Sequence, residues 1–127
     1  MDGLIRIVGV QRSEEPGKEF VLLQNQGSRR LSLRGHAVLS ERALVTGDLS
    51  VGAHCFSEDE PIASGVYVML VTGNGENRWG RTRDGAIVYV CHMNRPRAVW
   101  HGFPGPLHVL APQHTYADRS VEHLVMR

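Results

Sequence analysis

The chain has 127 residues, of which 42% are hydrophobic and 21% are charged. This length suits one domain with one core, and the hydrophobic content excludes a disordered chain. A formal net charge of +1 excludes a protein-wide field that would attract nucleic acid or a membrane surface. We therefore expect a single domain over residues 1–127.

Short apolar runs separated by turn residues follow one another along the chain. Each run ends at glycine, proline or polar residues, which is the pattern of short strands. The runs that we expect to form strands are 3–10, 19–25, 31–33, 36–40, 66–72, 86–91, 98–100 and 107–110. Residues 41–61 lack such a pattern, and we expect loops there. The tail over 115–125 fits a short helix, although its apolar residues also alternate as in a strand.

Eight or so short strands without long helices predict an all-β fold, and we expect a predominantly antiparallel β-sandwich. A small β-barrel has a similar number of strands and stays open as an alternative. The residues that we expect in the core are Phe20, Leu22, Tyr67, Met69, Ile87 and Tyr89.

The longest apolar run, 66–71, is too short to cross a bilayer. The first residues lack the basic start and the apolar stretch of a secretory signal peptide. The sequence therefore predicts a cytoplasmic protein with no membrane partner.

The order of motifs along residues 4–100 resembles that of the lamin-tail domain family. An opening strand is followed by Glu19-Phe20-Val21-Leu22-Leu23-Gln24-Asn25-Gln26-Gly27 and by Leu31-Ser32-Leu33-Arg34-Gly35. The strand over 66–71 then ends at Thr72-Gly73, and Trp79 follows in a loop. Two features depart from the family, because His36 replaces its usual tryptophan and residues 100–127 have no counterpart. The resemblance implies an immunoglobulin-like β-sandwich, without enzyme activity, that binds proteins or nucleic acid or holds assemblies together.

Catalytic patterns are missing from the sequence. No G-x-S-x-G elbow is present, and Cys91 and His92 point to opposite faces if they lie on a strand. The acidic run Glu58-Asp59-Glu60 lacks the ladder of a calcium loop, so a solvated loop is expected. Cys55 and Cys91 are expected to be reduced, buried thiols. We therefore expect no catalytic residue and no cofactor.

Seven histidines are the main candidates for a metal site. Zinc needs three or four ligands around one point, and no histidine or cysteine pair here has a zinc-binding spacing. We expect no structural metal. The alternative is a small enzyme or a metal-binding protein whose site lies in the histidine-rich C-terminal third. The residues that would form this site are His92, His101, His108, His114 and Tyr116.

Arginine and tryptophan form the most prominent candidate binding set. Arginine and aromatic side chains can stack on bases or anchor a protein interface. The binding residues that we expect are Trp79, Arg81, Arg83, Arg95, Arg97 and Trp100. The interpretation against this is that the arginines are solvated and the tryptophans belong to the core.

These patterns favour a non-enzymatic interaction or scaffolding module. We expect a protein partner, bound through an exposed sheet edge or through the loops with the arginines. Nucleic acid is a weaker possibility, and unpaired sheet edges make a homodimer plausible.

Overall fold

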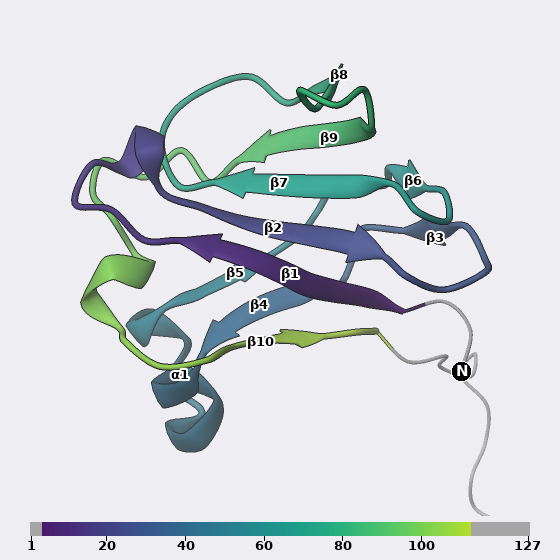
Figure 1. Ribbon diagram of the computed structural model, residues 1–127. Helices are drawn as coiled ribbons and strands as arrows, with labels where there is room; N and C mark the ends of the chain where they lie inside the picture. The colour runs from purple at the N-terminus through teal and green to yellow at the C-terminus, as the bar shows by residue number, and fades with distance from the viewer. Residues whose placement is uncertain (1–3, 113–127) are drawn as a thin grey trace, which may run out of the picture.

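The computed structural model describes residues 4–112, and these form an all-β protein with one short α-helix (Figure 1). The ten strands are β1 (Ile5–Gln11), β2 (Phe20–Asn25), β3 (Leu31–Ser32), β4 (Ala37–Ser40), β5 (Ala53–Cys55), β6 (Pro61–Ile62), β7 (Tyr67–Val71), β8 (Arg78–Arg81), β9 (Ile87–His92) and β10 (Leu107–Leu110). Helix α1 spans Glu41–Thr46, and the 3-10 helices are η1 (Pro16–Lys18), η2 (Leu49–Val51) and η3 (Trp100–Gly102). No helix within the described part is long and apolar enough to span a membrane.

The largest sheet has five strands in the order β1-β2-β7-β9-β8. Its neighbours are antiparallel except for β7 and β9, which run parallel. The parallel pair arises because the chain leaves β7, forms β8 at the edge, and then returns through β9 between the two. The expectation of a mainly antiparallel arrangement therefore holds for all pairs but this one.

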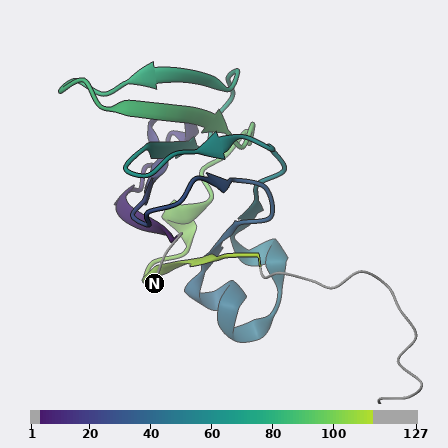
Figure 2. The same cartoon turned by 90° about the vertical axis from the view of Figure 1, so that its right-hand side faces the viewer.

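A second layer covers one face of the five-stranded sheet. It contains the sheet β10-β4-β5 and the two-stranded ribbon β3-β6 (Figure 2). Side chains from both layers meet in a single core, which includes Val21, Leu23, Val68 and Leu70 from one layer and Phe56 from the other. All five are no more than 1% exposed, so the core lies between the layers.

The expected core residues lie mostly on the wrong face of the sheet. In β2 and β7 the fully buried positions are Val21, Leu23, Val68 and Leu70, whereas Phe20, Leu22, Tyr67 and Met69 are half-buried on the opposite face. Ile87 is 45% exposed, and of the six only Tyr89 is buried, at 5%. The error arises because these strands are apolar on both faces, so their sequence gives no alternation that marks the inner one.

Three other segments differ from the expectations. Residues 78–81 form a strand although they lack an apolar run, and 98–100 do not form a strand but lead into η3. The segment 41–61 contains α1 and β5, which its irregular pattern did not predict. The helix expected over 115–125 lies outside the described residues.

Candidate functional site

The arginine–tryptophan set is divided between the two ends of β9. Trp79 and Arg81 belong to β8, and Arg81 pairs with Ile87 at the start of β9. Arg95 and Arg97 follow the other end of β9. The length of β9, from Ile87 to His92, is roughly 17 Å at the rise of an extended strand. The structure therefore brings Trp79, Arg81 and Arg83 together but not Arg95 and Arg97 with them.

Trp100 does not belong to an exposed binding surface. It is 0% exposed and is part of the hydrophobic core. The expectation that it contributes to a binding site is corrected, because a side chain with no exposed area cannot contact a partner.

Within residues 4–112, strand β8 lies at the edge of the sheet and pairs with β9 on one side only (Figure 1). It therefore leaves backbone groups unpaired among the residues described. The Thr82 N–H donates to the Ala86 carbonyl at 2.8 Å, which fixes the phase of the antiparallel ladder. In such a ladder alternate residues turn their N–H and C=O groups inward, so Gly80 pairs with β9 while Trp79 and Arg81 point their groups outward. The edge therefore offers two donors and two acceptors in extended geometry.

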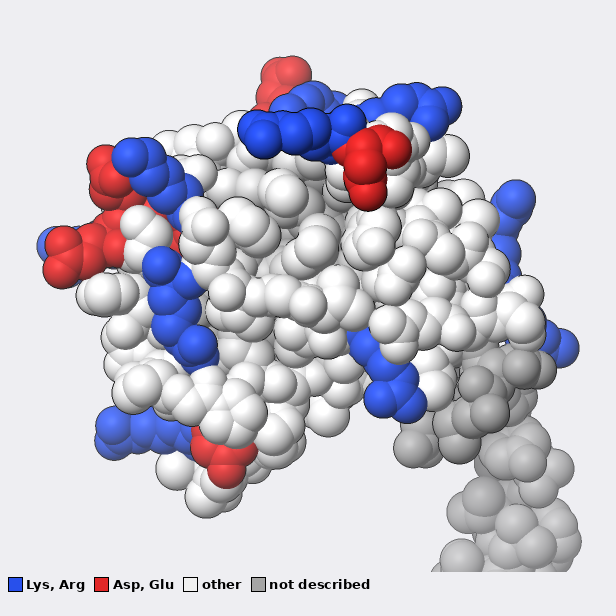
Figure 3. Space-filling model, in the orientation of Figure 1, with Lys and Arg blue, Asp and Glu red and all other residues white. Residues whose placement is uncertain are grey.

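An aromatic side chain and basic side chains flank this edge. The Trp79 ring packs on Tyr89 with ring centroids 5.0 Å apart, yet it stays 45% exposed. Arg78 and Arg81 are exposed on β8 and Arg83 on the following turn, and none of them forms an ion pair with the residues described. Figure 3 shows basic side chains at this end of the molecule with acidic side chains among them, and an uncharged area over the middle strands.

The turn after β8 also carries an ionised carboxylate, Asp84, next to Arg83. The Thr82 hydroxyl donates to the Asp84 carboxylate, and this bond is the main reason that the pKa of Asp84 is lowered. The carboxylate is thereby directed at its own turn. Arg81 Nη1 donates to the Gly85 carbonyl at 2.9 Å, which orients the guanidinium along the hairpin.

A buried carboxylate directly before β2 was not recognised as important in the sequence. Glu19 is 0% exposed, and its two oxygens accept hydrogen bonds from five donors. These donors are the Ser13, Val99, Trp100 and His101 N–H groups and the Thr72 hydroxyl, at 2.8–3.3 Å. Glu19 therefore joins the start of β2 to the loop that carries η3.

The segment from Glu19 to Gly27 contained a signal for these buried polar residues. Asn25, six positions after Glu19, is also 0% exposed. Its Nδ2 donates to the Arg29 and Ile62 carbonyls at 2.8 and 2.9 Å, and its Oδ1 accepts from the Gly27 N–H at 3.0 Å. A glutamate and an asparagine at the ends of one apolar strand thus mark loop anchors rather than contacts to a partner.

The histidines of the described part do not converge. His108 Nε2 contacts the Glu41 carboxylate, whereas His101 Nε2 lies 3.7 Å from Glu14. Within residues 4–112 no group of three histidine, cysteine or acidic side chains is placed to hold a metal ion. His114 and Tyr116 lie outside the described residues. Cys55 is exposed, contrary to expectation, whereas Cys91 is buried, and burial raises the pKa of the Cys91 thiol.

A small cleft lies between η2 and the loop that precedes η3. Its volume is about 230 Å³, and Arg95 is the one charged residue among those that line it. The other arginine of this loop, Arg97, is exposed and does not line the cleft.

Comparison of the chain with family models, curated proteins and solved structures gives no significant match.

Proposed function

We propose that the protein is a non-enzymatic interaction module that binds an extended acidic segment of a protein partner as an added strand on β8. The single observation that carries this proposal is the open edge at Trp79 and Arg81. Strand addition uses the outward N–H and C=O groups for affinity and the flanking side chains for specificity. Trp79 supplies an exposed aromatic anchor, which is common at protein interfaces.

The basic side chains favour an acidic segment over a second copy of the chain. In an antiparallel β8–β8 pair, arginines of one copy would face arginines of the other, and like charges opposite one another destabilise a sheet. An acidic segment instead meets Arg78, Arg81 and Arg83 with complementary charge. The resemblance to the lamin-tail family supports an immunoglobulin-like binding module of this kind.

The test uses a random library of 14-residue peptides selected on the immobilised protein, followed by affinity measurement by fluorescence anisotropy. We expect acidic peptides to be enriched and to shift the amide signals of Trp79 and Arg81 in two-dimensional NMR spectra. Arg81→Pro removes an outward N–H while leaving the ladder to β9 intact, and the preceding residue, Gly80, tolerates a following proline. This variant is expected to weaken binding about tenfold or more, since it removes a main-chain bond and a charge.

Two controls separate the backbone contribution from the charge contribution. Arg81→Gln keeps the N–H and removes the charge, so we expect a smaller loss, about threefold. Arg34→Gln changes an exposed arginine of the loop between β3 and β4 and should leave binding unchanged. Unchanged affinity of Arg81→Pro would refute strand addition. If oligonucleotides bind instead, with affinity that falls steeply as salt is added, nucleic acid becomes the better assignment.

A further inference from the structure

The cleft between η2 and η3 is lined by apolar side chains together with Ser50 and Arg95, and most of its exposed lining surface is polar. Leu49 and Ala53 line one side, and Ala98, Val99 and Phe103 line the other. Arg95 is the charged residue of the lining, and its backbone N–H is fixed by a bond to the Thr72 carbonyl at 2.9 Å. The Arg95 side chain forms no hydrogen bond or ion pair with any residue in the range 4–112.

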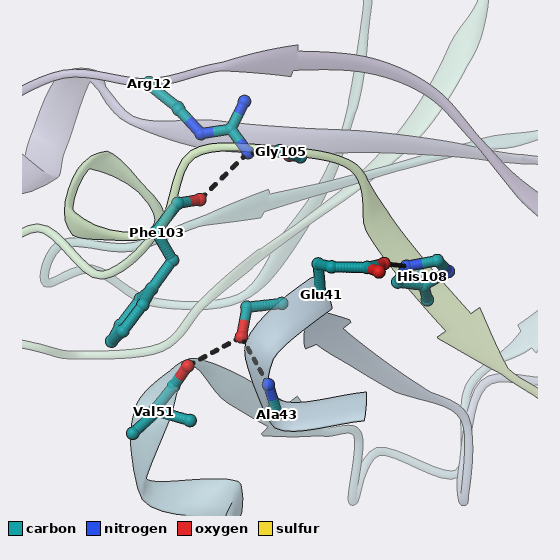
Figure 4. A network of polar contacts seen from close by, with 8 residues as sticks. Arg12, Glu41, Ala43, Val51, Phe103, Gly105 and His108 are labelled. Carbon is teal, nitrogen blue, oxygen red and sulfur yellow. Dashed lines mark hydrogen bonds and ion pairs between the residues drawn. The ribbon is translucent and has the colours of Figure 1, made fainter. Parts of the chain in front are cut away.

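Both walls are held in place by polar contacts from outside the cleft. Glu19 accepts hydrogen bonds from the Val99 and His101 N–H groups, each at 2.8 Å. The Arg12 guanidinium donates to the carbonyls of Trp100 and Phe103 at 3.0 and 3.2 Å, and Figure 4 shows it reaching this loop. These contacts fix the backbone of the second wall before any ligand arrives.

A serine fixes the first wall. Ser40 Oγ donates to the Val51 carbonyl at 2.6 Å and accepts from the Ala43 N–H at 3.0 Å, so it ties η2 to the first turn of α1 (Figure 4). Gly52 makes the two walls meet closely, since a Cβ there would lie 2.9 Å from the Phe103 ring. The cleft is thus a preformed feature, which lowers the entropic cost of binding.

The acidic groups closest in sequence to the lining are already engaged. The Asp48 carboxylate accepts from the Ser50 N–H at 3.0 Å and from the Ser50 hydroxyl at 2.6 Å. The pKa of His54 is lowered mainly by burial; the Glu58 charge raises it and the Arg95 charge lowers it further. A neutral His54 adds no competing positive charge beside Arg95.

We propose that this cleft binds the carboxylate of a small organic acid, with Arg95 holding the carboxylate and Phe103 and Leu49 packing on its short apolar chain. A guanidinium donates two parallel N–H bonds to the two oxygens of a carboxylate, which suits a planar monoanion. The cleft volume of about 230 Å³ leaves room for a small ligand. A branched acid such as 3-methylbutanoate has this size and chemistry. A peptide ending in leucine presents the same group, so the carboxylate has two possible sources.

The test is a titration of the whole chain followed by amide signals in two-dimensional NMR spectra. The probes are 3-methylbutanoate, its neutral amide, and the tripeptide Gly-Gly-Leu with a free or an amidated carboxyl end. We expect saturable shifts at Gly52, Val99 and Gly102 with the carboxylates and at least tenfold weaker binding of the amides. Tighter binding of the tripeptide assigns the cleft to a protein C-terminus, and tighter binding of the free acid assigns it to a small molecule.

Three variants decide whether the cleft and its arginine are responsible. Arg95→Gln should weaken binding about tenfold or more, whereas Arg97→Gln should change it less than twofold, because Arg97 does not line the cleft. Gly102→Leu adds a bulky side chain at a lining residue without a clash at the Cβ, since a Cβ there meets nothing within 4 Å, and it should weaken binding while Arg95 is retained. Spectra with native dispersion confirm that each variant is folded. The proposal is overturned if 50 mM carboxylate produces no shifts, or if Arg95→Gln or Gly102→Leu binds like the unmodified chain.

Discussion

Replacing Glu19 by glutamine should strongly destabilise the protein. The Glu19 Oε1 accepts three of the five hydrogen bonds and Oε2 accepts the other two, from the Ser13 and His101 N–H groups. A glutamine has one acceptor oxygen, so if this oxygen keeps the three bonds, its NH₂ group faces two N–H donors. Each buried donor left without an acceptor destabilises by about 1–3 kcal/mol, and we expect a total loss of about 4 kcal/mol.

The loss is large compared with the stability of a typical domain, which is about 5–15 kcal/mol. For a chain of this length it corresponds to a fall in Tm of roughly 12–20 °C. Urea unfolding followed by circular dichroism measures the change in the free energy of unfolding. Glu15→Gln is the matched control, since Glu15 forms an exposed ion pair with Lys18 and its loss should change stability by less than about 0.5 kcal/mol. A Glu19→Gln loss below about 1 kcal/mol would refute the anchoring role.

The pH dependence gives a second measure of the same carboxylate. Burial by itself raises the pKa of Glu19, but hydrogen bonds from Val99, Trp100, Thr72 and Ser13 together outweigh it, so the pKa lies below the ordinary 4.5. The ionised carboxylate therefore stabilises the fold in full above pH 4.5, and this contribution is lost as the pH falls through the lowered pKa. The difference in stability between the unmodified chain and Glu19→Gln should accordingly narrow below pH 4.5.

A glycine variant and a thiol reagent test two further features of the packing. Gly52→Ala should lower the free energy of unfolding, measured with urea, by about 2 kcal/mol or more, because the φ of Gly52 is +103° and the new Cβ would lie 2.9 Å from Phe103. The control Gly102→Ala should change this free energy by less than about 1 kcal/mol. A thiol reagent should label Cys55 rapidly in the native protein and Cys91 only after denaturation, because Cys91 is buried and its pKa is raised; rapid labelling of both, measured by mass spectrometry, would contradict the structure.

The strands that could be predicted from the sequence are those with apolar runs bounded by turn residues. Val68 and Leu70 lie in such a run, and so do Val21 and Leu23. Because both faces of these strands are apolar, the sequence does not indicate which face points into the core. Strand β8 has no apolar run, because an edge strand that projects beyond the second layer buries little of its surface. Its position depends on the ladder with β9, which is a tertiary contact that no local pattern encodes.

The candidate site could be predicted only in part, because tertiary contacts decide which of its residues come together. Trp79, Arg81 and Arg83 are close in sequence, so a shared hairpin brings them together. Arg95 and Arg97 are also close in sequence to one another, but β9 carries them to the opposite end of the sheet. Trp100 is adjacent to these arginines yet lies in the core, because Glu19 holds the backbone of its loop against the sheet.

The bonds of Glu19 also set the order in which the chain can become native during its synthesis. Its partners Thr72, Val99 and His101 lie 53, 80 and 82 positions further along. Until the last of these has left the ribosome, strands β1 and β2 would have to bury the Glu19 charge without most of its hydrogen-bond donors, which is unfavourable. We expect the nascent chain to stay unfolded until residue 101 has emerged and the domain then to form in one step, with the slow kinetics of distant contacts.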